Sequence, residues 1–222
     1  MMTSSIPPAI LAIGRNYADH AKEMGGTVPT HPIIFFKNPA SVIADGEPIV
    51  IPAICREGGP QVDFEGELAV VLSHDCRDVS EEDALGRVAG YAVANDVSAR
   101  WWQMHGAGGQ FSRGKSFDTF CPISKITPAS AVKDPQILRI QTRVSGELMQ
   151  DSSTSSMIFS VRRIISDLSR GMTLLKGTII LTGSPPGVGH ARNPPRYLRQ
   201  GDLVEISIEG VGTLTNPVIE AP

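Results

Sequence analysis

Apolar and polar residues alternate most clearly over residues 62–72. The even positions of this stretch are apolar except for Gly66, which predicts a strand with one face directed into a core. The odd positions begin with Asp63, Glu65 and Glu67. Because successive side chains of a strand point to opposite faces, the alternation places these three carboxylates on the same face.

Shorter apolar runs predict the other elements of the chain. Strands are expected over residues 9–13, 33–36, 88–96 and 178–182, and a closing hairpin over residues 203–208 and 212–216. Helices are expected over residues 17–24, from Ser80 through an acidic first turn, and over residues 157–168, where apolar residues recur at helical spacing. Strands outnumber helices, so the pattern predicts the α+β class.

The composition narrows the class of protein. The 222 residues suit one domain, and 41% hydrophobic and 19% charged residues with a net charge of -3 are typical of a soluble globular protein. Without a basic excess, neither a nucleic-acid partner nor a membrane partner is expected. The three cysteines form no Cys-x-x-Cys pair, so neither a disulfide framework nor a zinc site is indicated. No basic segment precedes the short apolar run at residues 9–13, and we expect a cytoplasmic protein.

Three acidic residues are candidate metal ligands. Like charges two residues apart on one strand face repel each other unless a cation or solvent separates them. An arbitrary Glu-x-Glu is usually solvated, but the apolar strand around Glu65 and Glu67 favours burial with a ligand. Asp96 ends a strand of small residues that can pass close to the first, although Asn95-Asp96 can equally begin a turn. If the three acids converge, a site without His or Cys selects a hard cation, namely Mg²⁺, with Mn²⁺ or Ca²⁺ as alternatives.

Candidate catalytic residues lie elsewhere in the chain. His20 and Glu23 are spaced i, i+3, which places them on one face of the expected helix. They form either an exposed polar turn or a dyad in which Glu23 orients His20 as a general base. Lys115 is either a solvated lysine or a cation beside a developing enolate oxygen. Arg15 follows the first strand and can hold a substrate carboxylate with two hydrogen bonds.

A loop rich in glycine and proline covers residues 182–189 after an expected strand. Within it, Gly183, Ser184 and Pro185 are candidates for close contact with a ligand. The loop matches neither a Walker motif nor a dinucleotide-binding fingerprint, so no nucleotide cofactor is expected. It also lacks a nucleophile elbow, because Ser184 stands one position too early for Gly-x-Ser-x-Gly.

Seven ordered blocks of the sequence together resemble the fumarylacetoacetate hydrolase family, in its short, single-domain branch of acylpyruvases and fumarylpyruvate hydrolases. The blocks span residues 14–20, 36–37, 63–68, 95–100, 114–122, 182–189 and 201–204. The resemblance implies a mixed β-roll or β-sandwich of the family's C-terminal-domain type. It also implies an N-terminal tail over residues 1–9, one catalytic domain over residues 10–222, and usually a homodimer.

The same resemblance implies roles for the candidate residues. The family's metal-binding acids are matched by Glu65, Glu67 and Asp96, its His-Glu dyad by His20 and Glu23, and its enolate-facing lysine by Lys115. Two positions depart from the family pattern. Ser184 replaces a usual threonine and keeps the hydroxyl, while Trp101-Trp102 replaces a pair that is commonly Asp-Leu, which bears on substrate breadth more than on catalysis.

The expected activity is metal-dependent hydrolysis of a carbon-carbon bond in a small 3-acylpyruvate, such as fumarylpyruvate or acetylpyruvate, giving pyruvate and a carboxylic acid. In this hypothesis the dyad activates a water molecule, while Arg15 and the loop around Gly183 hold the remaining substrate oxygens. Two alternatives use the same site on oxaloacetate, either to decarboxylate it or to interconvert its keto and enol forms. An alternative of another class is a catalytically silent metal-binding fold.

Overall fold

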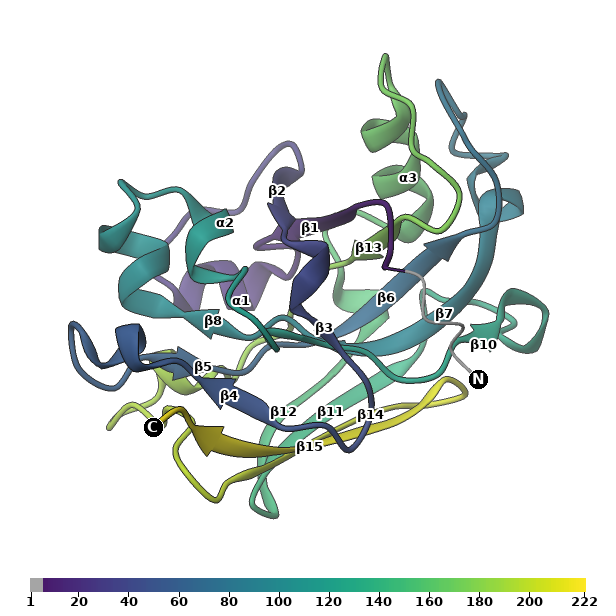
Figure 1. Ribbon diagram of the computed structural model, residues 1–222. Helices are drawn as coiled ribbons and strands as arrows, with labels where there is room; N and C mark the ends of the chain where they lie inside the picture. The colour runs from purple at the N-terminus through teal and green to yellow at the C-terminus, as the bar shows by residue number, and fades with distance from the viewer. Residues whose placement is uncertain (1–5) are drawn as a thin grey trace.

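The structure is a computed structural model that describes residues 6–222, and two main β-sheets lie one above the other in it (Figure 1). The six-stranded sheet has the order β10 (Thr127–Pro128), β7 (Val88–Asn95), β6 (Gly66–Leu72), β13 (Ile179–Leu181), β1 (Ile10–Gly14) and β2 (Ile33–Lys37). The five-stranded sheet has the order β12 (Glu147–Ser153), β11 (Arg139–Val144), β14 (Leu203–Ile208), β15 (Gly212–Glu220) and β4 (Ile49–Ile51).

Two short strand pairs and a few helices complete the fold. The pairs are β3 (Val42–Ile43) with β9 (Cys121–Pro122) and β5 (Val62–Asp63) with β8 (Ser98–Ala99). The α-helices are α1 (Ala18–Glu23), α2 (Phe111–Gly114) and α3 (Val161–Ser169). Short 3₁₀ turns lie at Pro39–Ser41, Ala53–Arg56, Ala84–Arg87, Ala129–Ala131, Thr154–Ser156 and Gly189–Ala191, and a π-helical turn lies at Trp102–Gly106. The α+β class predicted from the sequence is confirmed.

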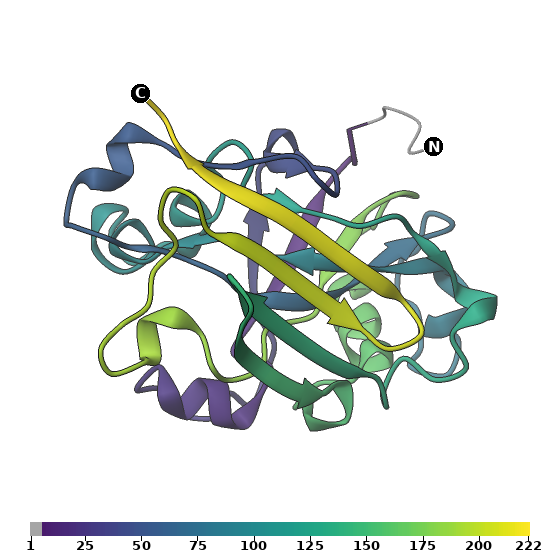
Figure 2. The same cartoon turned by 90° about the horizontal axis from the view of Figure 1, so that it is seen from below.

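Strand β6 is buried along its whole length, because both faces of the six-stranded sheet are covered. On one face, Leu68 and Val70 join a core that includes side chains of the five-stranded sheet and of α3. Figure 2 shows the five-stranded sheet lying across this face. On the opposite face, Ala69 and Val71 pack with Cys121 and other small or apolar side chains. Any charged residue at the end of β6 is therefore held away from bulk water.

Strand β13 occupies the middle of the six-stranded sheet. It pairs in parallel with β1 and antiparallel with β6, both of which come much earlier in the chain. By contrast, β1 pairs with β2 and β6 pairs with β7, which is the next strand of this sheet along the chain. This arrangement brings three segments together, namely helix α1 after β1, the loop after β13, and the start of β6. The backbone N–H of Gly187 in that loop donates to Glu23 of α1, and the N–H of Gly183 donates to Glu67 of β6.

The strand predicted over residues 62–72 is interrupted, which corrects the prediction that its three odd acids share one face. The chain leaves the strand at Phe64 and Glu65 and divides into β5 and β6. β5 pairs with β8, while β6 pairs with β7, and the N–H of Glu65 donates to the side chain of Asn95 instead of to a strand backbone. Asp63 is thereby separated from the two glutamates.

Two predicted helix starts are also wrong. Helix α3 begins at Val161, not at residue 157, because Ser160 caps it by accepting from the N–H of Arg163. The residues just before it are not helical, and the N–H groups of Ile158 and Phe159 donate to Asn16. Near Ser80, the side chain accepts from the Asp83 N–H as an N-cap would, but only the 3₁₀ turn Ala84–Arg87 follows.

The remaining predicted elements are present with small shifts at their ends, and β15 continues to Glu220. The alternation did not predict β11 and β12. Of the expected N-terminal tail, residues 1–5 lie outside the described residues, and β1 begins at Ile10. Among residues 6–222, none of the helices has the length and apolar character needed to cross a membrane.

Candidate metal and active site

The three predicted acids converge at one end of the β6–β7 hairpin. Register pairs Gly66 with Asn95, so that Glu65, Glu67 and Asp96 lie around the same point, and the Asp96 N–H donates to the Glu65 carbonyl at 2.8 Å. One oxygen from each carboxylate lies within 4.8 Å of the others, and all three residues are buried. An all-carboxylate donor set of this kind fits a hard divalent cation.

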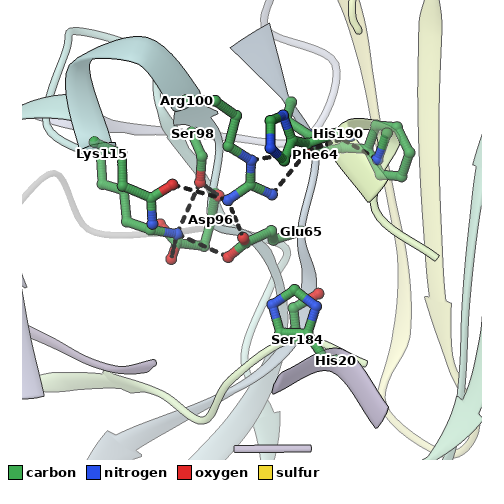
Figure 3. Close-up of polar contacts among 12 residues, drawn as sticks. His20, Phe64, Glu65, Asp96, Ser98, Arg100, Lys115, Ser184 and His190 are labelled. Carbon is green, nitrogen blue, oxygen red and sulfur yellow. Dashed lines mark hydrogen bonds and ion pairs between the residues drawn. The ribbon is translucent and has the colours of Figure 1, made fainter. Parts of the chain in front are cut away.

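Two buried lysines contact these acids. Lys115 Nζ lies 2.7 Å from Glu65 Oε2 and 2.5 Å from Asp96 Oδ2, and it also donates to Ser98 Oγ at 2.7 Å (Figure 3). Lys37 Nζ lies 2.5 Å from the other Asp96 oxygen. The structure therefore brings Lys115 to the site, as expected, and adds Lys37, to which sequence reasoning gave no role. A signal was available, since Lys37 stands two positions after Phe35 and shares its face if the strand predicted over residues 33–36 continues by one residue, as it does in β2.

An arginine that sequence reasoning missed joins the site to a fourth acid. Arg100 is 1% exposed, and its Nε and NH2 donate to Asp63 Oδ2 at 2.9 and 2.7 Å. Its NH1 lies 2.7 Å from Glu65 Oε1 (Figure 3). Asp63 also accepts from the backbone N–H groups of Gly189 and His190. Asp63 is therefore not a metal ligand here; it holds Arg100 against Glu65.

The charges of this region do not balance within the described residues. Four buried carboxylates, including Asp63, face the three buried cations Lys37, Arg100 and Lys115. Burial would raise the pKa of Glu65, but Lys115 and Arg100 outweigh it and hold that pKa well below its usual value. Burial, together with the carboxylates of Asp96 and Glu65, raises the pKa of Glu67 well above its usual value. Within residues 6–222 Glu67 has no ion-pair partner, and a bound cation would supply one.

The predicted dyad is formed. His20 Nδ1 lies 2.7 Å from Glu23 Oε1, and Glu23 also accepts from the N–H of Gly187 at 2.9 Å. A carboxylate that only accepts hydrogen bonds requires the proton of the ring on Nδ1, which leaves Nε2 with a free lone pair. His20 is buried and lines the same pocket as Glu65 and Lys115. The ring is thus oriented to accept a proton from a molecule in that pocket.

One pocket adjoins the acids, and most of the predicted residues line it. Its polar lining consists of Arg15, His20, Glu65, Arg100, Gln103, Lys115 and Ser184. Its apolar lining includes Phe35, Met104 and Phe111. Arg15 has φ of 56°, a left-handed conformation that is uncommon outside glycine. Strained backbone of this type concentrates at ligand-binding positions.

Other predicted residues lie behind the pocket wall. The Gly183 N–H donates to Glu67 Oε2 at 2.6 Å, and the Pro185 carbonyl accepts from Gln150, so direct contact of either with substrate stays a prediction.

The two tryptophans that depart from the family pattern are not in the pocket lining; Trp101 instead packs close to Gly58. A wider hollow of about 630 Å³ over the β14–β15 turn contains none of the predicted site residues.

The fold and the acid cluster together define a mixed β-sandwich with a buried carboxylate cluster that fits a hard cation. Comparison with known proteins agrees with this class. The model of the family "Fumarylacetoacetate (FAA) hydrolase C-terminal" matches residues 9–219. The chain is 44% identical over 214 residues to the mitochondrial oxaloacetate tautomerase fahd2 of Xenopus laevis, covering 96% of this chain and 66% of that protein. It is 45% identical over 212 residues to the oxaloacetate tautomerase YisK of Bacillus subtilis, covering 94% of this chain and 69% of that protein.

Solved structures give the same result. A fumarylacetoacetate hydrolase from Exiguobacterium antarcticum superposes with a TM-score of 0.85 at 42% identity, covering 97% of this chain and 76% of that one. A 5-carboxymethyl-2-hydroxymuconate delta-isomerase from Mycobacterium smegmatis gives 0.84 at 40% identity, covering 98% and 80%. The chain belongs to the fumarylacetoacetate hydrolase family, and its C-terminal-domain fold is confirmed. It spans about two thirds of the length of the curated relatives above.

Proposed function

We propose that this chain catalyses the interconversion of the keto and enol forms of oxaloacetate. The observation that carries the proposal is that the pocket combines an oriented base, His20, with a buried ammonium group, Lys115, beside the three acids. Tautomerisation needs only a base to move a proton and cations to stabilise an enolate oxygen. Relatives that are 42–45% identical over nearly the whole chain carry the name oxaloacetate tautomerase, which supports this choice.

In the proposed reaction His20 moves the proton. Its Nε2 removes a proton from C3 of the keto form, and the electron pair of the broken C–H bond forms the C2–C3 double bond of an enolate. Glu23 holds the imidazole ring in position and stabilises it while it is charged. The same nitrogen then returns its proton to the oxygen on C2, so that the enol forms without any net gain or loss of atoms.

The residues present fit a divalent cation. Glu65, Glu67 and Asp96 would hold it, and the bound ion would act as a Lewis acid toward the oxo oxygen of the substrate. We propose Mg²⁺, with Mn²⁺ or Ca²⁺ as alternatives, because all three donors are carboxylates.

The remaining cations favour an anionic substrate such as a dicarboxylate. Four buried carboxylates face three buried cations, so a divalent ion would leave the region with one net positive charge. Arg15 on the pocket wall adds another and Glu23 of the dyad offsets it, so the metal-loaded region keeps a net positive charge, which favours an anionic ligand. Lys115 would stabilise the developing enolate oxygen, while Arg15 and Ser184 would bind carboxylate oxygens.

The sequence interpretation put hydrolysis of 3-acylpyruvates first and tautomerisation among the alternatives. The names of the relatives favour the alternative, and the proton transfer of the tautomerase requires neither an attacking water nor loss of carbon dioxide. Hydrolysis and decarboxylation are therefore the competing outcomes of the test.

The test measures three substrates side by side with Mg²⁺-loaded protein. Loss of the ultraviolet absorbance of enol-oxaloacetate reports tautomerisation, and a coupled assay for pyruvate reports hydrolysis of acetylpyruvate and fumarylpyruvate or decarboxylation of oxaloacetate. We expect enol loss well above the rate without protein, and little release of pyruvate. Release of pyruvate from an acylpyruvate, with enol-oxaloacetate decaying at its uncatalysed rate, would overturn the proposal in favour of hydrolysis.

One catalytic domain over residues 10–222 and a homodimer also remain proposals. Limited proteolysis tests the first, since an internal boundary would give stable fragments. Light scattering in solution tests the second.

A further inference from the structure

Gln150 of β12 connects the five-stranded sheet to both sides of the candidate site. It is fully buried, and its Oε1 accepts from the N–H of Gly66 at 3.0 Å. Its Nε2 donates to Ser184 Oγ at 2.8 Å and to the Pro185 carbonyl at 2.7 Å. Gly66 lies between two of the three acids, and Ser184 lines the pocket. The Gln150 side chain therefore joins the strand that carries Glu67 to the loop that carries the Ser184 hydroxyl.

The glycine between the acids reflects how closely this sheet approaches. A Cβ atom on Gly66 would collide with Thr142 Oγ1 of β11 and lie 3.3 Å from Gln150 Oε1. Residue 66 is therefore a glycine for reasons of space, and the five-stranded sheet supports the acid strand directly.

The hydrogen bonds determine which way the Gln150 amide points. The Gly66 N–H can only donate, so it requires the oxygen of the amide, and the Pro185 carbonyl can only accept, so it requires the nitrogen. Ser184 Oγ thus receives a hydrogen bond from Nε2. The hydroxyl proton of Ser184 remains available for an acceptor elsewhere.

Two directions are open to that proton. The Pro185 carbonyl lies 3.4 Å from Ser184 Oγ, a long distance, and already accepts from Gln150 at 2.7 Å. The other direction is the pocket, where an oxygen of a carboxylate or enolate would be a stronger acceptor. Ser184 is therefore prepared to donate to an anionic ligand.

We propose that Gln150 is a positioning residue that fixes Ser184 as a hydrogen-bond donor to an anionic oxygen of the substrate. The inference rests on the proposed function only in that Ser184 contacts the ligand. It deepens that function by assigning the ligand group at this point: an oxygen that only accepts hydrogen bonds.

The test measures binding of oxalate, a dianion whose oxygens only accept hydrogen bonds, to the Mg²⁺-loaded protein by calorimetry. Gln150→Met keeps the length of the side chain but removes its donors, so that Ser184 can turn its proton to the Pro185 carbonyl. We expect oxalate affinity to fall about 10-fold or more, the loss of one hydrogen bond to a charged group, with Mg²⁺ affinity within a few fold of wild type. The rise in KM for oxaloacetate should exceed the fall in kcat.

A double-mutant cycle separates positioning from a general loss of structure. Ser184→Ala should weaken oxalate to a similar degree, and adding Gln150→Met to it should cost little more. Additive losses would overturn the proposal. Unchanged oxalate affinity in Ser184→Ala would overturn it as well, even if Gln150→Met did not fold.

Gln136 offers a matched control. Like Gln150, it accepts from a backbone N–H, that of Val161, and donates to a backbone carbonyl, that of Thr154. Gln136→Met should lower the melting temperature while leaving oxalate affinity at the wild-type value. Because the readout is oxalate binding, the proposal survives if wild-type protein fails to tautomerise oxaloacetate, and the two failures can be told apart.

Discussion

Two buried carboxylates in different regions of the molecule have opposite surroundings. Asp202, before β14, accepts two hydrogen bonds from the Arg196 guanidinium at 2.6 and 2.9 Å and further ones from Ser145 Oγ and the Arg199 N–H. Glu67, at the start of β6, accepts one from the Gly183 N–H and, within residues 6–222, has no cationic partner.

The pKa values follow these surroundings. Burial would raise the pKa of Asp202, but hydrogen bonds from Arg196 and Ser145 outweigh it and lower that pKa. The pKa of Glu67 is raised by burial and then by its acidic neighbours. An acid with satisfied oxygens stabilises the fold, whereas an acid kept buried among like charges destabilises it and is useful only with a ligand. A substitution of Glu67 should therefore reduce function without reducing stability, and a substitution of Asp202 should reduce stability without reducing function.

The largest effect is expected for His20, the proposed base in the pocket that adjoins the three acids. His20→Gln should lower kcat for tautomerisation by about 10²- to 10⁴-fold, because glutamine cannot take up the proton. Mg²⁺ affinity and melting temperature should stay close to wild type, since His20 is not among the three acids. Steady-state kinetics with calorimetry on the same sample checks this. A variant with wild-type kcat would remove His20 from the mechanism.

Glu67→Gln should weaken Mg²⁺ binding by about 100-fold or more, beyond the 10- to 100-fold typical of residues that only support a ligand. It should also raise the melting temperature of the metal-free protein, because glutamine removes the cost of ionising a carboxyl buried among like charges, and the rise should grow with pH as more of Glu67 is ionised. Calorimetric titration and thermal unfolding with a chelator measure the two effects. A lower melting temperature without metal would contradict the contrast with Asp202.

Asp202→Asn should have the reverse pattern, with activity retained and stability lost. Leaving the buried hydrogen-bond donors of Arg196 and Ser145 poorly matched should cost about 2 kcal/mol. For a chain of this length that corresponds to a melting temperature lower by about 4–8 °C. Loss of activity at a temperature where the variant is folded would show that Asp202 is also needed by the site.

The pH dependence of this loss has a defined sign. Because the pKa of Asp202 is lower in the folded than in the unfolded protein, its stabilisation is fully present above the unfolded value of about 4 and disappears as pH falls below it. The difference in free energy of unfolding between wild type and Asp202→Asn should therefore be full at pH 6 and smaller at pH 3, and it should keep shrinking until the pH falls through the folded pKa of Asp202. Denaturant titrations at both values give the comparison.

The smallest effect is expected for an exposed pair. Arg139 and Asp151 are 2.7 Å apart on the outer side of the five-stranded sheet. Solvent screens such pairs, so Asp151→Asn should change the free energy of unfolding by less than about 1 kcal/mol. A larger change would show that distance, rather than burial, sets the contribution of an ion pair in this protein.

Local patterns in the sequence predicted much of the site. Alternation in a strand identified Glu65 and Glu67, and the i, i+3 spacing identified His20 and Glu23, because both patterns depend only on neighbouring residues. Lys37, Arg100 and Gln150 were missed as parts of the site. Each is polar and buried. The partners that tie it to the site lie 34–84 positions away in the chain, so no local pattern marks the side chain as internal.

The fold was predicted less completely for the same reason. Strands β11 and β12 escaped because their inward positions include Thr142 and Gln150, which break the apolar alternation. The break between β5 and β6 depends on pairing with β8 and with Asn95, which only the folded chain provides. The late start of α3 depends on Asn16, which binds the preceding segment from 143 positions away.

The central position of β13 has a consequence for how the protein forms. The β6–β7 hairpin can pair as soon as residues up to about 95 are available, but at that point Glu65 still lacks the Lys115 ammonium group and Glu67 still lacks the Gly183 N–H. The dyad meets the acids only after β13, more than 80 residues later, inserts between β1 and β6. Pairing at such long sequence separation is slow. During synthesis the three acids and the His20–Glu23 dyad therefore come together only once residues up to about 181 are available, so the site forms late although most of its residues are made early.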